Sequence, residues 1–245
     1  MSRLDALNAI IAEPRSIRLV EEDIYSVLPP TQHLHQYDRY AGVYDFLVNS
    51  RLYNRVMWGD SPQSFMAFAN DAVNSSREGC ILDAGCGSLL FSARTHLECR
   101  RRVIACDQSL DMLRRARRRL MAFGGSIPER ICLLQAELSD LPFRAASFQT
   151  ILCLNVLHHY ANVPGLVSGF SDLLVNDSGH IYLTSLVLSN RFIGDHYLAV
   201  LHRRGWIVTP RRETGLRSLL RECLGAKMNY RTQGNLAYAK TVGAS

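Results

Sequence analysis

The chain has 245 residues, of which 47% are hydrophobic and 20% are charged, and its formal net charge is +6. This composition excludes a disordered or collagen-like chain and predicts one packed domain with additions. No apolar run is long enough to cross a bilayer, and the stretch 1–16 contains Asp5 and Glu13 and lacks the apolar core of a signal peptide. The seven cysteines form no C-x-x-C pair and no zinc-type spacing. We therefore expect a protein of a reducing compartment, most simply the cytoplasm, with no metal site.

Residues 1–78 place leucine and isoleucine at helical spacing. Three segments predict helices here: RLDALNAIIAE, IRLVEEDIYSVL and the tyrosine-rich QYDRYAGVYDFLVNSRLYNRVMWG. Pro14, Pro29 and Pro30 separate them. We expect these helices to lie as a lid over the ligand-binding edge of the domain that follows.

Residues 79–245 alternate β-rich runs with helical patterns, which predicts a parallel sheet covered on both faces. The predicted parallel strands are CILDAG, RRVIACD, RICLLQAEL, SFQTILCLNV and HIYLTSLVL. A helix in SLDMLRRARRRLMAFGG, capped by Ser109, follows the second strand, and VPGLVSGFSDLLVNDSG predicts a helix before the fifth. The final segment, GAKMNYRTQGNLAYAKTV, predicts an antiparallel pair of edge strands that turns at Gly234 and Asn235.

The turn after the first of these strands, within ILDAGCGSLLFS, contains Gly85 and Gly87 just after Asp83. Ligands of open α/β sheets bind beyond the carboxyl ends of the strands, where this turn lies. A dinucleotide fingerprint needs a third glycine where the sequence has Leu90, and no Gly-Lys-Ser/Thr of a phosphate loop follows. Asp107, at the end of the second strand, is placed to accept hydrogen bonds from both hydroxyls of a ribose, while Asp83 is placed to anchor the turn or meet an ammonium group. These features suit a nucleoside that carries an amino acid and no phosphate, which describes S-adenosylmethionine.

The motifs in this part of the chain resemble those of the Rossmann-like (class I) S-adenosylmethionine-dependent methyltransferases. The resemblance runs from about Tyr37 to the C-terminus and is strongest to the small-molecule branch that includes ubiquinone/menaquinone-type methyltransferases. The matching segments are YDRYAGVYD, DAGCG, CDQSLDML, AELSDLPF, SFQTILCLNVLHHY and LLVNDSGHIYLTS. We therefore expect an α/β fold with a mostly parallel seven-stranded sheet, helices on both faces and an antiparallel C-terminal edge strand. Residues 1–78 would form the helical lid and residues 79–245 the S-adenosylmethionine-binding domain.

The resemblance implies a set of cofactor-binding residues along these motifs. They are Tyr37, Tyr44, Asp83, Ala84, Gly85, Cys86, Gly87, Asp107, Gln108, Met112, Ala136, Glu137, Leu138, Leu154 and Asn155. The cofactor would be S-adenosylmethionine and the product S-adenosylhomocysteine. Met112 would lie near the adenine, and Glu137, or alternatively Asp140, would meet the adenine amine.

The sequence departs from the family pattern at several positions. Leu89 replaces a frequent third glycine, Glu137 replaces the commoner aspartate, and Gln149 replaces an acid after the Ser-Phe pair. These departures predict either a normal pocket or a weakened one.

Methyl transfer is an in-line displacement, so the protein mainly aligns the acceptor and excludes water. A general base is needed where the acceptor must lose a proton. His158 and His159, just beyond the fourth predicted strand, are the catalytic candidates, with packing of the next helix as the alternative.

Other aromatic and histidine residues have a weaker claim to the site. The tyrosines at positions 37, 40 and 44 share one helical face, which predicts either a lid contact or ordinary packing. Packing or exposure is favoured over a direct role for His33, His35, His196 and Trp206.

The segment RRARRRL is the best argument for a nucleic-acid partner. Leu110, Leu113 and Leu120 trace a buried stripe, however, so the arginines form the outer, solvated face of an amphipathic helix away from the strand ends. We therefore favour methylation of a small organic acceptor at oxygen, nitrogen or carbon over an RNA or protein methyltransferase. A third hypothesis is a binding or scaffold protein that keeps the fold without the activity. The acceptor and the oligomeric state, a homodimer included, stay open.

Overall fold

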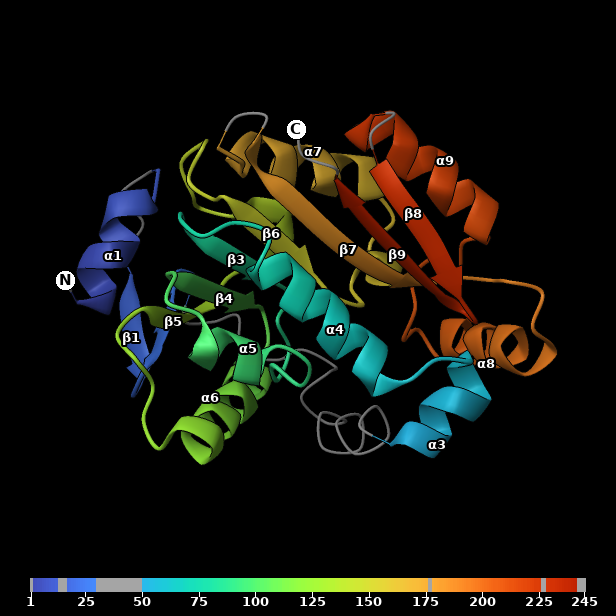
Figure 1. The fold of residues 1–245 in the computed structure, drawn as a ribbon, viewed down its shortest axis with the longest axis horizontal. Coiled ribbons are helices and arrows are strands. Elements are labelled where there is room, and N and C mark those ends of the chain that lie inside the picture. The colour runs from blue at the N-terminus through green and yellow to red at the C-terminus, as the bar shows by residue number, and fades with distance from the viewer. Residues whose placement is uncertain (1, 13–16, 30–49, 176–177, 226–227, 242–245) are drawn as a thin grey trace.

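The computed structural model describes residues 2–12, 17–29, 50–175, 178–225 and 228–241. In these ranges a nine-stranded sheet runs in the order β1-β2-β5-β4-β3-β6-β7-β9-β8 (Figure 1). Its strands are β1 (Arg18–Glu21), β2 (Ile24–Ser26), β3 (Ile81–Ala84), β4 (Val103–Asp107), β5 (Ile131–Gln135), β6 (Thr150–Cys153), β7 (His180–Leu186), β8 (Met228–Gln233) and β9 (Leu236–Thr241). The strands from β2 to β7 pair in parallel, whereas β1 and the β9-β8 pair are antiparallel edges. The predicted parallel strands and the C-terminal hairpin are confirmed.

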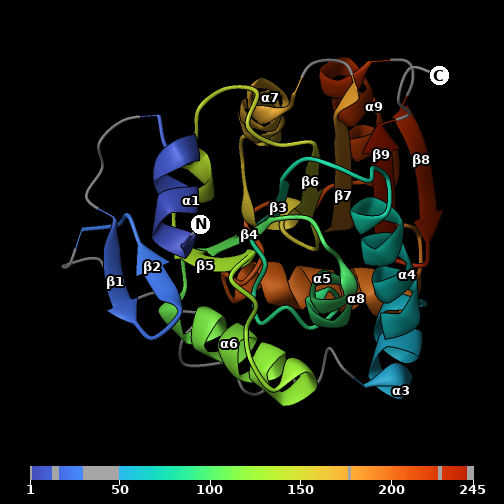
Figure 2. The same ribbon diagram turned by 60° about the vertical axis from the view of Figure 1, so that its left-hand side comes forward.

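Helices cover both faces of this sheet, as Figure 2 shows with the sheet turned toward its edge. The helical elements are α1 (Arg3–Ile10), α3 (Arg51–Tyr53), η2 (Asn54–Trp58), α4 (Pro62–Val73), α5 (Ala93–Glu98), α6 (Leu110–Gly124), η3 (Leu138–Asp140), η4 (Leu157–His159), α7 (Val163–Leu173), α8 (Phe192–Arg203) and α9 (Glu213–Leu224). Side chains of α1, α7 and α9 pack on one face, and those of α4, α5 and α6 pack on the other. Among the described helices, none is long and apolar enough to span a membrane.

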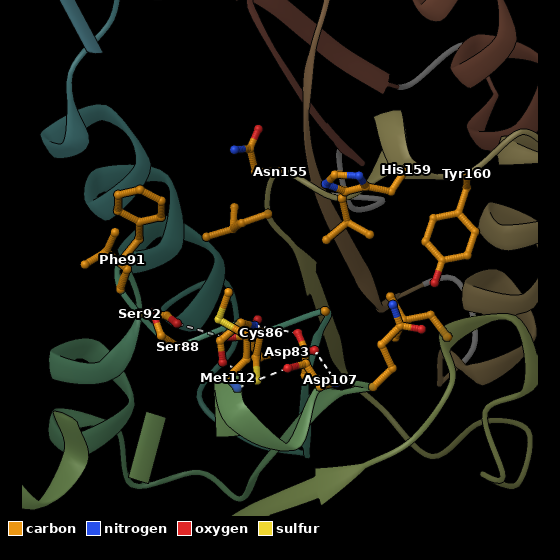
Figure 3. Close-up of a pocket in the computed structure, with 18 residues that line it drawn as sticks. Asp83, Cys86, Ser88, Phe91, Ser92, Asp107, Met112, Asn155, His159 and Tyr160 are labelled. Atoms are coloured by element: carbon orange, nitrogen blue, oxygen red, sulfur yellow. Dashed lines mark hydrogen bonds between the residues drawn. The ribbon is translucent and has the colours of Figure 1, made fainter. Parts of the chain in front are cut away.

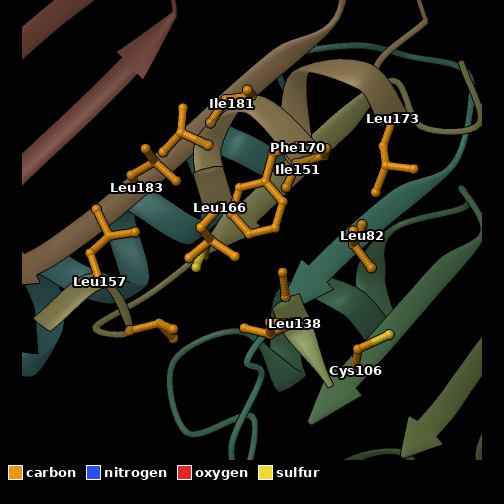
Figure 4. Packing of buried hydrophobic residues seen from close by; sticks show 14 of the residues in the cluster. Leu82, Cys106, Leu138, Ile151, Leu157, Leu166, Phe170, Leu173, Ile181 and Leu183 are labelled. Atoms are coloured by element: carbon orange, nitrogen blue, oxygen red, sulfur yellow. The ribbon is translucent and has the colours of Figure 1, made fainter. Parts of the chain in front are cut away.

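The two layers follow from the two-residue period of the strands. Ile151 and Ile181 point to one face, where they join Phe170 of α7 in the buried cluster of Figure 4. Their neighbours Leu152 and Tyr182 point to the other face, and the Tyr182 ring lies 5.2 Å from a phenylalanine ring of α4. Burying one such side chain contributes about 1.5–3 kcal/mol, so these apolar runs favour a sheet covered on both sides.

The prediction of helices throughout residues 1–78 is wrong for the segment IRLVEEDIYSVL. This segment forms the antiparallel strands β1 and β2, which turn at Asp23 with φ +66°. Strand β2 then pairs in parallel with β5, with Ile24 opposite Leu133. Burial alternates along β2, since Ile24 and Ser26 are buried and Tyr25 is half-buried. The edge of β5 that faces β2 offers backbone hydrogen-bonding groups, which the leucine spacing of this segment does not reveal. The two additional strands bring the sheet to nine strands, where seven were predicted.

The rest of the N-terminal region bears on the predicted lid. Helices α1 and α4 form, and α4 packs on the face of the sheet through Phe65 and Phe68. The candidates between positions 30 and 49, which are His33, His35, Tyr37, Tyr40 and Tyr44, lie outside the described residues. The lid and the division at residue 78 therefore stay predictions.

The arginine-rich helix α6 is paired with the acidic turn of the N-terminal hairpin. Arg114 Nε donates to Glu21 Oε1 at 2.8 Å, and Arg117 forms ion pairs with Glu22 and Asp23. Exposed ion pairs of this kind contribute little stability, but they neutralise part of the basic face. Much of the local positive charge is therefore balanced within the chain.

Candidate functional site

An open pocket lies beyond the carboxyl ends of β3, β4 and β6, with about 1040 Å³ of empty space including its mouth (Figure 3). Most of the predicted cofactor-binding residues meet here, although they come from four separate motifs. Those that line the pocket are Asp83, Gly85, Cys86, Gly87, Asp107, Gln108, Met112, Leu138, Leu154 and Asn155. Seven further lining residues were not predicted to bind the cofactor, and they are Ser88, Leu90, Phe91, Ser92, Ser109, Val156 and Tyr160.

The two glycines of the turn after β3 are required for different reasons. Gly85 has φ +68°, and a Cβ there would lie 2.6 Å from Val156 Cγ2. The turn therefore requires a residue that adopts a positive φ and has no side chain to collide with Val156. Gly87 has φ +51°, and a Cβ there would meet nothing within 4 Å in the described structure. Its bare backbone therefore borders open space, where a ligand can approach closely.

Leu89 also has a left-handed backbone, with φ +54°, which explains why a glycine is frequent at this position in the family. Its side chain is fully buried and packs with Val103 and Leu113 on the face of the sheet below the turn. Leu89 therefore does not line the pocket, and burial of the leucine offsets the backbone strain of about 1–3 kcal/mol. This departure from the family pattern leaves the pocket open.

Asp107, at the end of β4, connects this turn to the start of α6. Its Oδ2 accepts a hydrogen bond from Gly87 N at 2.8 Å, and its Oδ1 accepts one from Ser109 N at 2.9 Å. These two N–H groups fix the plane of the carboxylate at the wall of the pocket. A carboxylate offers about four lone-pair sites, so Asp107 can also accept hydrogen bonds from the two hydroxyls of a ribose.

Asp83, at the end of β3, is held from the opposite side by α5. Its Oδ2 lies 2.8 Å from Ser92 Oγ and 2.8 Å from His96 Nε2. The sequence analysis missed His96, although the four-residue spacing between Ser92 and His96 is a signal that both lie on one helical face. Of the two roles expected for Asp83, anchoring the turn is what these contacts show.

Three predicted residues lie outside the lining of the pocket. Ala84 and Ala136 are fully buried in the core at the strand ends. Glu137 lies behind Tyr160, whose hydroxyl donates to Glu137 Oε1 at 3.2 Å, and burial together with this carboxylate raises the pKa of Tyr160. The alternative to Glu137, Asp140, is exposed.

The structure separates the two catalytic candidates. His158 is buried, its Nδ1 accepts a hydrogen bond from Leu186 N at 3.3 Å, and its carbonyl accepts one from Val208 N at 3.1 Å. Burial lowers the pKa of His158 well below its usual value. His158 is therefore not among the described lining residues of the pocket, and its catalytic role stays a prediction.

His159 lines the pocket beside Asn155 and Tyr160 (Figure 3). Burial lowers the pKa of His159 to about 4, while a hydrogen bond to the backbone of Trp206 acts in the opposite direction. The imidazole is therefore neutral at pH 7. Trp206 thus contributes through its backbone, whereas His196 is exposed on α8, where it stacks on Phe192 with ring centroids 6.3 Å apart.

The charge of the pocket restricts what can bind. Among the described lining residues, Asp83 and Asp107 are the acidic groups and there is no lysine or arginine. Burial and then these two carboxylates raise the pKa of the Cys86 thiol, which stays protonated. A site with this charge favours a cationic ligand and disfavours a pyrophosphate.

Comparison with known proteins agrees with this geometry. Residues 81–177 match the model of a family described as a methyltransferase domain. The YcgJ protein from Bacillus subtilis is 19% identical, with a TM-score of 0.54 over 69% of this chain and 70% of that chain. An S-adenosylmethionine-dependent methyltransferase from Thermotoga maritima is 15% identical, with a TM-score of 0.59 over 84% and 97% of the two chains.

A third solved structure is phosphoethanolamine N-methyltransferase 2 from Haemonchus contortus in complex with S-adenosylmethionine. It is 12% identical, with a TM-score of 0.65 over 88% of this chain and 59% of that chain. At this identity the solved structures establish the fold. No curated protein sequence matches the chain.

The strand order from β5 to β8 and the glycine turn at the point where that order reverses define a Rossmann-like α/β domain. Together with the family match, they confirm the resemblance predicted from the motifs. Residues 81–177 therefore match a methyltransferase domain, and the fold of the described chain is that of the solved methyltransferases.

Proposed function

We propose that this protein binds S-adenosylmethionine in the pocket beyond β3 and β4 and transfers its methyl group to a small organic acceptor. The observation that carries the proposal is the pairing of the glycine turn with two carboxylates in a pocket whose described lining has no lysine or arginine. A cationic nucleoside without phosphate satisfies this arrangement. The pyrophosphate of a nicotinamide dinucleotide would instead meet two carboxylates and a turn whose Gly87 N–H already donates to Asp107.

The residues of the pocket divide the binding task. Asp107 would accept hydrogen bonds from the ribose hydroxyls, because its two oxygens are already oriented by Gly87 N and Ser109 N. Met112 and Leu138 supply apolar surface on the adenine side. When bound, S-adenosylmethionine supplies a methyl group on a positively charged sulfur, and the chain then has to align the acceptor and exclude water. The proposal includes the predicted contacts of Tyr37 and Tyr44 with the cofactor.

His159 is the candidate general base for acceptors that lose a proton. Its ring is neutral and hydrogen-bonded to the backbone of Trp206, so its second nitrogen can accept a proton on the pocket side. Its lowered pKa makes it a weak base, which suits an acceptor that loses its proton late, after the new bond has begun to form. Acceptors that carry no such proton would need only alignment.

The comparisons support a small acceptor but do not identify it. The solved structures of similar fold include a phosphoethanolamine N-methyltransferase and a geranyl diphosphate methyltransferase. The alternative, an RNA or protein acceptor, rests on the net charge, and the ion pairs between α6 and the acidic hairpin weaken it. A location in the cytoplasm and a homodimer are further proposals.

The test is transfer of a labelled methyl group from S-adenosylmethionine to a panel of small amines, phenols and carbon acids, with bulk RNA and protein as parallel acceptors. The proposal predicts label in one or more small acceptors, and loss of that label in Asp107→Ala. Label that enters RNA or protein alone would favour the alternative. Cofactor binding without transfer to any acceptor would favour the scaffold hypothesis.

A further inference from the structure

The carboxylate of Asp83 is held by two donors that α5 brings to the same oxygen. Ser92 Oγ and His96 Nε2 each lie 2.8 Å from Asp83 Oδ2. The side chain of His96 is 0% exposed and that of Asp83 is 2% exposed, although Asp83 still lines the pocket. The group is therefore a buried hydrogen-bonded unit that reaches the ligand space through its carboxylate.

The second nitrogen of His96 indicates the charge of this unit. His96 Nδ1 is buried, and the described part of the chain offers it no hydrogen-bond partner. A buried N–H without an acceptor costs about 1–3 kcal/mol, and a charged one costs more. The neutral ring with its proton on Nε2 avoids that cost, because Nε2 donates to Asp83 and Nδ1 carries a lone pair. Asp83 then keeps its negative charge.

A buried carboxylate of this kind needs a positive partner. Within the described ranges, no lysine or arginine forms an ion pair with Asp83. The serine and the neutral histidine supply hydrogen bonds without cancelling the charge. A cationic group of a ligand in the pocket would supply that positive charge.

We propose that His96 and Ser92 are positioning residues that hold Asp83 as the anionic counter-charge for the ammonium group of the bound cofactor. The inference rests on the proposed function, because the methionine part of S-adenosylmethionine supplies that ammonium. Asp107 serves the ribose at the other wall, so the two carboxylates have separate tasks. Without its two donors, the carboxylate loses the hydrogen bonds that fix its orientation at the pocket.

Two probes separate these tasks. S-adenosylhomocysteine carries both the ribose and the ammonium, whereas 5′-methylthioadenosine carries the ribose and lacks the amino acid. Calorimetric titration of the full chain with each probe is compared for wild type, His96→Leu, His96→Gln and Ser92→Ala. Leu97→Ala on the same helix is the matched control for simple loss of packing in α5.

We expect His96→Leu to weaken the binding of S-adenosylhomocysteine about tenfold and to change the affinity for 5′-methylthioadenosine by less than twofold. His96→Gln retains an N–H donor and should restore affinity to near the wild-type value. Ser92→Ala should also weaken the binding of S-adenosylhomocysteine and leave that of 5′-methylthioadenosine nearly unchanged. This variant therefore tests the positioning role even where His96→Leu does not fold. Leu97→Ala should leave the ratio of the two affinities unchanged.

Equal weakening of both probes in His96→Leu and Ser92→Ala, or no change in either, would overturn the positioning role while leaving the proposed function intact. A folded wild-type protein that binds neither probe nor S-adenosylmethionine would overturn both. The two failures are therefore distinguishable.

Discussion

The two ends of the pocket are built in different ways. The proposed cofactor end comes mainly from one stretch of chain, in which β3, the glycine turn, β4 and the start of α6 follow one another between Asp83 and Met112. The proposed acceptor end joins the loop after β6 to a segment far along the chain. There the guanidinium of Arg211 donates to the carbonyls of Leu157 and Tyr160.

This difference decides which end of the pocket can be predicted from the sequence. Positive φ angles at Gly85 and Gly87 are local properties of the turn, so residue type reveals them. The position of His159 depends instead on a hydrogen bond to the backbone of Trp206, which no local pattern encodes. If this division holds, substitutions at the cofactor end should change cofactor affinity, and substitutions at the acceptor end should change turnover.

The largest expected effect is on turnover at the acceptor end. For an acceptor that loses a proton, His159→Ala should lower kcat by about 100-fold or more, since positioned general bases contribute on that scale. Affinity for S-adenosylhomocysteine should stay within about threefold. His158→Gln is the matched control and should affect stability more than turnover. Equal kcat losses in both variants would mean that His159 acts through packing.

At the cofactor end, Asp107→Ala should weaken the binding of S-adenosylhomocysteine by about 10–100-fold, because hydrogen bonds to a charged group contribute about 1.5–3 kcal/mol. Calorimetry measures the loss, and circular dichroism confirms the fold. Asp111→Ala, in the first turn of α6, is the matched control and should bind normally. Unchanged affinity in a folded Asp107→Ala protein would contradict the placement of the ribose.

Leu89→Gly should lower the free energy of unfolding by about 2 kcal/mol, because losing a buried leucine outweighs the relief of its left-handed backbone. Cofactor affinity should not change, since the leucine packs beneath the turn. Denaturant titration and calorimetry measure the two quantities. Tighter cofactor binding in this variant would show that Leu89 does obstruct the pocket.

Stability should fall in mild acid because of the buried histidine pair. The folded-state pKa values of His158 and His159 lie below the usual 6.5, so folding favours the neutral rings. Their contribution to stability is complete above about pH 6.5 and is lost as pH falls toward 4. His158→Gln, measured by denaturant titration at pH 7 and pH 5, should lose less stability between these values than wild type. An equal loss in both proteins would assign the acid sensitivity to other groups.

The smallest expected effect is at the basic helix. Replacing Arg115 and Arg118 by serine should leave cofactor affinity and small-molecule turnover unchanged, because neither residue lines the described pocket. Filter binding to RNA at rising salt provides the contrast. A large loss of turnover together with a loss of RNA binding would favour the nucleic-acid alternative.

The sequence predicts the cofactor end well because each of its elements carries a local signal. Apolar runs predict β3 and β4, and Ser109 caps α6 as expected, with its Oγ accepting a hydrogen bond from Met112 N. The hairpin of β1 and β2 escapes prediction because its strand character depends on the edge of β5. His96 escapes for a similar reason, since its importance comes from burial against Asp83.

The measurement that tests the central claim most directly is calorimetric titration of the purified protein with S-adenosylmethionine and S-adenosylhomocysteine, with NADH as the control. We expect saturable binding of both sulfur nucleosides, with Kd in the range of about 1–100 µM. We expect no binding of NADH, because its pyrophosphate would meet the carboxylates of Asp83 and Asp107. Binding of NADH alone, or of none of the three by a folded protein, would contradict this expectation.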